Sequence, residues 1–246
     1  MNWQIKSKAP EKFIKQFPEY PPLVLHLLYD RGLANQKAID EFFNPDYSAD
    51  LHDPFLMKGM KQAVRRLQKA AKAKEEMVIF ADYDCDGVCG AVILETILKT
   101  IGANLLGVYI PDRSKEGYGL NIKAIQELKN RGVKLILTID CGITDDEEIK
   151  FAKSLGVEVI VVDHHQIVKK IPQAIVVDPW QKGDRYPFKK LAAAGVAFKL
   201  GQALICQLAD KKMPEGWEKW LLDLVALATV ADCMPLLGEN RTLVKY

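Results

Sequence analysis

The stretch from Val78 to Leu94, VIFADYDCDGVCGAVIL, sets three aspartates at alternate positions directly after an apolar run: Asp82, Asp84 and Asp86. Alternate residues of an extended segment point the same way, so two of these carboxylates can face one point in space. Like charges that are held close together repel one another and lose hydration unless protons or cations compensate. The spacing therefore favours a site for divalent cations.

More acidic and imidazole side chains follow the other apolar runs of the chain: Asp140 after LILTI, Asp163, His164 and His165 after VIVV, Asp178 after AIVV, and Asp232 at the end of LATVAD. One aspartate after a strand usually caps the N-terminus of the next helix, and we give that interpretation to Asp178, which precedes Pro179. Capping needs one carboxylate for each helix, and these positions offer more than that. The surplus again indicates bound cations.

The chemistry of these ligands predicts the ions and the reaction. Carboxylate oxygens suit Mg²⁺ or Mn²⁺, and imidazole nitrogens shift the preference towards Mn²⁺. Two such ions that share a carboxylate are the usual apparatus for in-line attack on phosphorus. The residues alone therefore predict a metal-dependent phosphoryl hydrolase. Cys85, Cys141 and Cys233 adjoin three of the aspartates, but without CxxC pairs they are expected to be small buried thiols and not zinc ligands.

The elements that must position these groups begin at Met77, where apolar runs of strand length alternate with helical stretches. The runs cover residues 77–81, 104–110, 133–139, 157–162 and 174–177. They are apolar at nearly every position, which is typical of strands that are buried on both faces. Two more helical stretches are expected after the last run, at residues 191–210 and 215–232. The alternation predicts an α/β fold with a doubly wound, mainly parallel sheet flanked by helices. Ligands of such sheets bind beyond the carboxyl ends of the strands, where the aspartates lie.

The first part of the chain has a different character. Residues 1–55 read as short helices broken by prolines, so we expect a small helical N-terminal appendage before a catalytic domain at residues 56–246. The stretch from Gly59 to Glu75 predicts an amphipathic helix, with apolar residues at Met60, Val64 and Leu67. Its other face is rich in lysine and arginine. That face is either simply exposed to solvent or contacts the phosphates of a nucleic-acid backbone.

Composition excludes several classes of protein. The net charge of +2 neither demands nor excludes nucleic acid. No apolar run approaches the roughly 20 residues that span a bilayer, and the N-terminus lacks the apolar stretch of a secretory signal. Five cysteines in 246 residues do not form a disulfide scaffold. We therefore expect a cytoplasmic protein without membrane contact.

Four motifs stand in order along the chain: DYDCDG at 82–87, TIDCGIT at 138–144, VDHH at 162–165 and ATVADCMPL at 228–236. With these motifs the sequence resembles the DHH phosphoesterase superfamily and, within it, the branch of RecJ-type exonucleases. That resemblance implies an enzyme with two Mn²⁺ or Mg²⁺ ions that digests single-stranded DNA from 5′ to 3′ during repair and recombination. Single-strand-binding protein or a helicase is an expected partner. The DHHA1 and OB-type domains of such enzymes do not fit after Asp232, so a truncated catalytic core is expected.

The resemblance also implies roles for individual residues. The implied ligands of the two ions are Asp84 and Asp86, Asp140 as the bridging carboxylate, and His164 and Asp232 as further ligands. His165 would touch metal or the scissile phosphate, Asp163 would orient its neighbours, and Asp82 lies beside the ligands without an assigned role. Pyrophosphatases of the superfamily have a histidine at the position of Phe80. Because phenylalanine binds no metal, one ion should be held more weakly.

Several loop residues could contact the substrate. Arg113 is the preferred ligand of a backbone phosphate, and the further candidates are Lys115, Arg185, Lys189 and Lys190. Tyr118 could stack on a base or ribose, or it could be a packed loop aromatic. Two alternative functions remain open. One is a hydrolase of short oligonucleotides, cyclic dinucleotides or phosphoadenosine phosphate, and the other is a noncatalytic module that binds DNA.

Overall fold

The computed structural model describes residues 7–168, 170–207 and 213–246, and these residues form two compact units divided between Asp50 and Leu51. The first unit contains three short helices: α1 Glu11–Gln16, α2 Pro22–Asp30 and α3 Gln36–Phe43. They bury a small core of their own: Ala9, Phe13, Phe17, Leu25, Leu28 and Ile39. Short helices next to prolines are thus confirmed here. The predicted domain limit at residue 55 falls within a 3₁₀ turn of the second unit, η1 Pro54–Leu56, and the domain assignment stays a prediction.

The second unit is built on a five-stranded sheet in which every pairing is parallel. Its strands are β1 Met77–Ala81, β2 Leu105–Tyr109, β3 Leu135–Ile139, β4 Glu158–Val162 and β5 Ile175–Val177, in the order β2-β1-β3-β4-β5. The five predicted strands are confirmed, with slightly trimmed ends. The order reverses between β1 and β3, because the chain goes from β1 to β2 on one side and then returns to β3 on the other.

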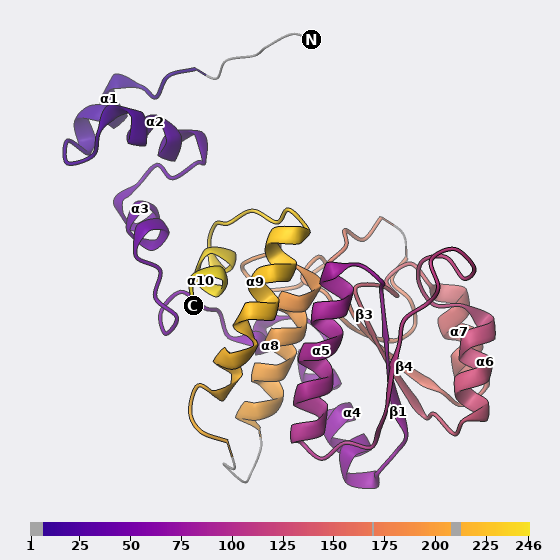
Figure 1. Cartoon of the computed structure of the whole chain (residues 1–246). Coiled ribbons are helices and arrows are strands. Elements are labelled where there is room, and N and C mark those ends of the chain that lie inside the picture. Colours follow the sequence, from indigo (N-terminus) through magenta and orange to yellow (C-terminus); the bar gives the residue numbers. More distant parts are fainter. Residues whose placement is uncertain (1–6, 169, 208–212) are drawn as a thin grey trace. The chain divides into compact units, whose positions relative to one another are not determined.

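Helices cover both faces of this sheet, as the doubly wound prediction requires (Figure 1). α6 Ile122–Asn130 and α7 Asp146–Ser154 lie on one side, where Ile125, Leu128 and Ile149 join a core with Phe80 and Val161 of the strands. The other side carries α4 Met60–Ala73, α5 Cys85–Thr100 and α8 Ala193–Cys206, and α5 and α8 pack closely against each other. α9 Leu222–Ala231 packs on α5 and α8, and α10 Glu239–Lys245 packs on α9.

Three sequence-based expectations need correction. β2 is an edge strand, and its burial alternates, so Leu106 and Val108 are 39% and 37% exposed where two buried faces were expected. The predicted helix over 215–232 begins as a separate 3₁₀ turn, η2 Trp217–Leu221. Among the cysteines beside the aspartates, Cys141 is buried but Cys233 is exposed. The end of the predicted helix at 208–210 lies outside the described residues.

A buried ion pair fixes the last helix to the sheet domain. Lys199 of α8 lies 3.2 Å from Glu239 of α10, and both side chains are almost fully buried. Tyr186 donates its hydroxyl hydrogen to the other Glu239 oxygen at 2.6 Å. Because burial is costly for an unpaired charge, these contacts hold α8, α10 and the loop at Tyr186 in one arrangement. Within the described residues, no helix is long and apolar enough to cross a membrane.

Candidate metal centre

The carboxyl-terminal edge of the sheet carries an aspartate directly after four of its five strands: Asp82 after β1, Asp140 after β3, Asp163 after β4 and Asp178 after β5. All four side chains are buried. β1 and β3 are the neighbours between which the strand order reverses, so Asp82 and Asp140 lie at the switch point of the fold. This is the place where open α/β sheets bind their ligands.

The first turn of α5 supplies two further carboxylates. Asp84 is the N-cap residue of this helix, and its Oδ1 accepts hydrogen bonds from the backbone N–H groups of Asp86 and Gly87 at 2.9 and 3.0 Å. The two oxygens of Asp86 accept from the backbone N–H groups of Ala193 and Ala194 at 2.6 and 2.7 Å. Asp86 therefore caps α8, whose own N-cap residue offers no side-chain acceptor.

His164 lies where the carboxylates converge. Its Nδ1 is 3.1 Å from the carbonyl oxygen of Leu191, which can only accept, so the hydrogen must be on Nδ1. The Nε2 atom lies 3.3 Å from Asp140, 3.6 Å from Asp86 and 3.7 Å from Asp232. Burial disfavours the charged ring, but the Asp140 oxygen 3.3 Å from Nε2 and the surrounding carboxylates raise the pKa of His164 to about 9.

His165 is held by Asp163. Its Nδ1 lies 2.7 Å from Asp163 Oδ1, and the same oxygen accepts from the backbone N–H groups of His164 and His165. Burial opposes the charge of Asp163, but these hydrogen bonds outweigh burial and lower its pKa. The hydrogen bond to Asp163 also raises the pKa of His165, whose side chain remains 48% exposed. Asp163 thus favours the charged form of an imidazole at the rim of the acidic cluster.

Several buried carboxylate oxygens of the cluster lack a hydrogen-bond partner. Such oxygens are available to bind metal ions. Among the described residues, the buried Oδ1 atoms of Asp82 and Asp140 accept no hydrogen bond of good geometry. Burial raises the pKa of Asp140 to about 7 and raises that of Asp82. Three groups of side chains each place one ligand atom per residue within 4.8 Å of the others: Asp82, Asp84 and Asp140; Asp86, His164 and Asp232; Asp140, His164 and His165. Asp140 and His164 each belong to two groups, and of these two Asp140 is the carboxylate, which two ions can share, so the donor set fits two hard divalent cations.

Asp140 also has an unusual backbone, and Tyr118 contacts it. Asp140 has a φ of 61°, the left-handed region that few residues other than glycine adopt. Tyr118 donates its hydroxyl hydrogen to the carbonyl oxygen of Asp140 at 2.8 Å, and its ring lies edge-on to His165 with centroids 6.3 Å apart. Gly117 and Gly119, both with positive φ, shape the loop on either side of the tyrosine. Tyr118 therefore contacts the site through a hydrogen bond that the sequence analysis did not foresee.

The predicted phosphate ligands have different surroundings. The guanidinium of Arg113 lies 5.2 Å from the ring centroid of Tyr83, the residue between Asp82 and Asp84. Lys115 pairs with Asp112 at 3.3 Å and Lys189 with Asp184 at 2.5 Å. Arg185 lines a separate hollow, and Lys190 is exposed. Arg113 is thus the candidate that the structure places beside the acidic cluster.

Asp178 does not cap a helix, so this expectation of the sequence analysis was wrong; it closes a turn. Its Oδ1 accepts from the backbone N–H of Trp180 at 2.7 Å. The Oδ2 atom is buried and has no hydrogen-bond partner among the described residues. Burial raises the pKa of Asp178 to about 7.

Backbone groups that the sequence analysis did not identify hold two of the site's side chains in place. The carbonyl of Leu191 and the N–H groups of Ala193 and Ala194 orient His164 and Asp86, and Asn240 of α10 donates to the neighbouring Lys190 carbonyl at 2.6 Å. The small residues of LAAAG at 191–195 were the available signal, because they let a backbone approach closely. No sequence pattern pointed to Asn240.

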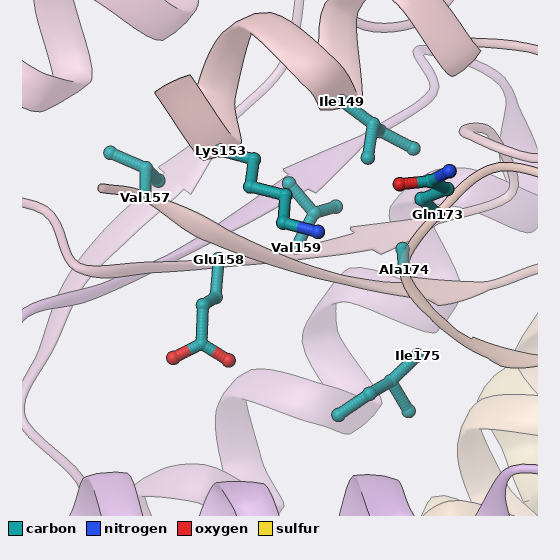
Figure 2. A pocket seen from close by; sticks show the side chains of 8 residues that line it. All are labelled: Ile149, Lys153, Val157, Glu158, Val159, Gln173, Ala174 and Ile175. Atoms are coloured by element: carbon teal, nitrogen blue, oxygen red, sulfur yellow. The ribbon is translucent and has the colours of Figure 1, made fainter. Parts of the chain in front are cut away.

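A second hollow lies away from the acids. Figure 2 shows this hollow, of about 280 Å³, lined by Ile149, Lys153, Val157, Glu158, Val159, Gln173, Ala174 and Ile175. Glu158 and Ile175 are the first residues of β4 and β5, so the hollow is at the end of these strands opposite the aspartates. Its lining is largely apolar and brings no cluster of carboxylates together.

Comparison with known proteins gives consistent matches. Residues 76–229 match the model of the DHH family, N-terminal domain. The single-stranded-DNA-specific exonuclease RecJ of Bacillus subtilis is 42% identical over 247 residues, which cover 99% of this chain and 30% of that protein. RecJ of Escherichia coli is 32% identical over 98% of this chain and 42% of that protein. The chain thus spans less than half the length of these relatives.

A solved structure extends the likeness to three dimensions. The crystal structure of RecJ in complex with Mn²⁺ from Thermus thermophilus superposes with a TM-score of 0.76 at 32% identity, covering 99% of this chain and 34% of that one. The DHH family match includes every strand of the sheet and the predicted ligands except Asp232. This chain therefore belongs to the DHH family.

Proposed function

We propose that this chain carries the active site of a two-metal phosphodiesterase that digests single-stranded DNA from 5′ to 3′ in repair and recombination. The observation that carries the proposal is the clustering of five carboxylates with His164 and His165 at the switch point of the sheet, in three overlapping groups, two of which contain Asp140. RecJ relatives are named as single-stranded-DNA-specific exonucleases, and solved RecJ structures are titled as complexes with Mn²⁺ and with Mg²⁺.

The donor groups suggest how two Mn²⁺ or Mg²⁺ ions would be held. Asp86, His164 and Asp232 would hold one ion, Asp84 with Asp82 would hold the other, and Asp140 would contribute to both. When bound, such ions activate water and neutralise charge that develops on a phosphate. The Leu191 carbonyl keeps the hydrogen of His164 on Nδ1, so that Nε2 is available as a ligand.

The remaining residues would bind and orient the substrate. Asp163 fixes the ring of His165 and favours its charged form, which suits contact with an oxygen of the scissile phosphate. Arg113, beside Tyr83, would bind a second phosphate oxygen. We also propose that the protein is cytoplasmic, because its proposed substrate, DNA, is found in that compartment. A single-strand-binding protein or helicase as partner rests on the resemblance alone.

The test is digestion of end-labelled single-stranded DNA with Mn²⁺ by the wild type, by Asp140→Ala and by the matched control Glu147→Ala, which changes an exposed acid on α7. Loss of the shared ligand should reduce the rate at least about 10³-fold, whereas the control should digest like the wild type. Preference for a dinucleotide over a long 5′-phosphorylated strand would favour the small-substrate alternative. Binding of DNA without Mn²⁺-dependent cleavage would favour the noncatalytic module.

A further inference from the structure

A row of positive charges runs along the exposed side of α4. Lys61, Arg65, Lys69 and Lys72 are all exposed and follow one another at intervals of four, four and three residues, so they line one face of the helix. We call these four residues the α4 stripe. The segment from Met60 to Lys74 contains no acidic residue. Like charges one turn apart destabilise a helix slightly, so nothing within α4 itself favours this arrangement.

The stripe differs from other lysines on the surface of the domain. Lys99 pairs with Glu95 on α5, and Lys150 pairs with Asp146 on α7, each one helical turn away. In the part of the chain that the structure describes, no acidic group lies within 4.0 Å of the charged nitrogens of the α4 stripe. Arg66 of the same helix, which is not in the stripe, pairs with Glu75 and Glu158. The stripe therefore presents uncompensated positive charge.

A basic hollow of about 320 Å³ continues the stripe beyond the start of α4. It is lined by Phe55, Leu56, Met57, Lys58, Gly59, Lys61, Gln62, Gly183 and Arg185. The N-cap residue of α4 is Gly59, so no side chain satisfies the first N–H groups of the helix, and the first turn contains no acid. The Met60 N–H donates to the carbonyl of Met57 at 3.2 Å, and the dipole of the helix N-terminus attracts anions. Asp184 beside the hollow pairs with Lys189 and accepts from the backbone N–H of Lys58 at 2.6 Å.

The hollow is joined to the candidate metal centre by one short loop. Arg185 lines the hollow, and six residues later the carbonyl of Leu191 orients His164. The exposed Lys190 lies between them along the chain. Gly59, at the start of α4, lies against the carbonyl of Val176 in β5, two residues before Asp178. The basic surface thus begins beside the strand that ends at Asp178 and follows α4 from there.

We propose that the α4 stripe and the hollow bind the sugar-phosphate backbone of a single-stranded nucleic acid beyond the bond that the metal centre cleaves. Four residues of helix rise about 6 Å, a step comparable to that between successive phosphates of an extended strand. Separate charges at this interval suit a backbone without base preference. This inference rests on the proposed function, because it takes the substrate to be a strand longer than the site itself.

The test measures binding without cleavage. The whole chain is titrated into a fluorescent oligothymidylate in EDTA, and anisotropy is followed over a range of salt concentrations. The test variant is Lys61→Gln/Arg65→Gln/Lys69→Gln. The matched control, Lys129→Gln/Arg131→Gln/Lys134→Gln, removes two lysines and one arginine around the end of α6 on the other face of the sheet. Circular dichroism and thermal melting check that both variants fold.

The stripe variant should bind about tenfold more weakly at low salt, and the slope of log affinity against log salt should become shallower by about 2, since three phosphate contacts are lost. The control should bind within about twofold of the wild type, and Lys61→Arg/Arg65→Lys/Lys69→Arg should retain affinity. Equal weakening in the stripe variant and the control would mean that only net charge matters and would overturn the inference. Digestion of end-labelled single-stranded DNA by the wild type in Mn²⁺ tests the proposed function separately, because the binding assay requires no chemistry.

Discussion

Asp140 combines three properties that are each costly in a folded protein: a buried carboxylate, an oxygen without a hydrogen bond and a left-handed backbone. Aspartate tolerates this backbone better than most residues, yet the conformation persists only where surrounding contacts enforce it. The hydroxyl of Tyr118 is one such contact. A bound cation would interact with the free oxygen. The three unfavourable properties of Asp140 are therefore consistent with a residue that serves as a metal ligand.

We predict that Tyr118→Phe lowers Mn²⁺ affinity and the cleavage rate, each by about tenfold, because one hydrogen bond that holds the Asp140 backbone is lost. Calorimetric titration with Mn²⁺ and a cleavage assay measure the two effects. The matched control is Tyr109→Phe, which removes the hydroxyl that binds Glu116 and leaves the acidic cluster alone. If both variants lose Mn²⁺ affinity equally, Tyr118 has no specific role at Asp140.

Asp178 gives a prediction about stability and pH. Burial raises its pKa to about 7, so the folded protein binds this proton more tightly than the unfolded chain does. The contribution of Asp178 is therefore most favourable below pH 4 and is lost as the pH rises towards 7. Asp178→Asn can still accept from Trp180 but carries no charge. In EDTA, urea unfolding should show the variant to be more stable than the wild type at pH 8, by a few kcal/mol at most, with a smaller difference at pH 5. If the variant is less stable than the wild type at pH 8, the buried charge of Asp178 does not destabilise the folded state.

At the scale of elements, the metal centre depends on how closely α5 approaches the end of β1. A Cβ atom built on Gly87 would lie 2.5 Å from the carbonyl oxygen and 2.8 Å from the carbonyl carbon of Asp82. Both are backbone atoms and cannot rotate aside. The glycine therefore lets the first turn of α5, with Asp84 and Asp86, lie directly against the residue that ends the strand.

We expect Gly87→Ala to reduce cleavage more than about 100-fold, since a shift of about 1 Å in the ligands is enough to disrupt the site. Gly195→Ala on α8 is the control: its Cβ would meet Leu191 side-chain atoms at ordinary contact distances of 3.4 Å. Steady-state cleavage with Mn²⁺, together with thermal melting, compares the two. Similar activity of both variants would show that the close approach at Gly87 is not required.

Elements also show how far the sequence predicts the structure. Apolar runs located all five strands, and the acids that follow them located the site, because strand ends in a parallel sheet meet at one edge. The burial of β2 was predicted wrongly, because an apolar run does not reveal whether its strand lies at the centre or the edge. The contacts of Leu191, Ala193 and Ala194 could not be predicted, since every residue has the same backbone groups and only the fold selects among them.

At the scale of the sheet domain, aspartates after β1, β3, β4 and β5, in the first turn of α5 and at the end of α9 gather at one edge of the sheet. Without metal ions, the repulsion between these carboxylates destabilises the folded state. We predict that excess Mn²⁺ raises the melting temperature of the wild type by several degrees over its value in EDTA, because an ion that binds only the folded state stabilises it. Differential scanning calorimetry measures the shift for this domain.

The variant Asp140→Asn should behave in the opposite way. At pH 8 in EDTA it should melt above the wild type, because it removes a buried carboxylate whose pKa is raised to about 7. It should respond little to Mn²⁺. A variant that melts lower in EDTA yet gains as much from Mn²⁺ as the wild type would contradict a shared ligand at this position.

The edge strand β2 has a consequence for the behaviour of the protein in solution. One side of this strand has no neighbour in the described sheet, and the side chains of Leu106 and Val108 are partly open to water. Unpaired edges of this kind can recruit strands from other molecules. Concentrated samples should therefore self-associate along this margin, and a lysine in place of Val108 should delay precipitation without touching the aspartates.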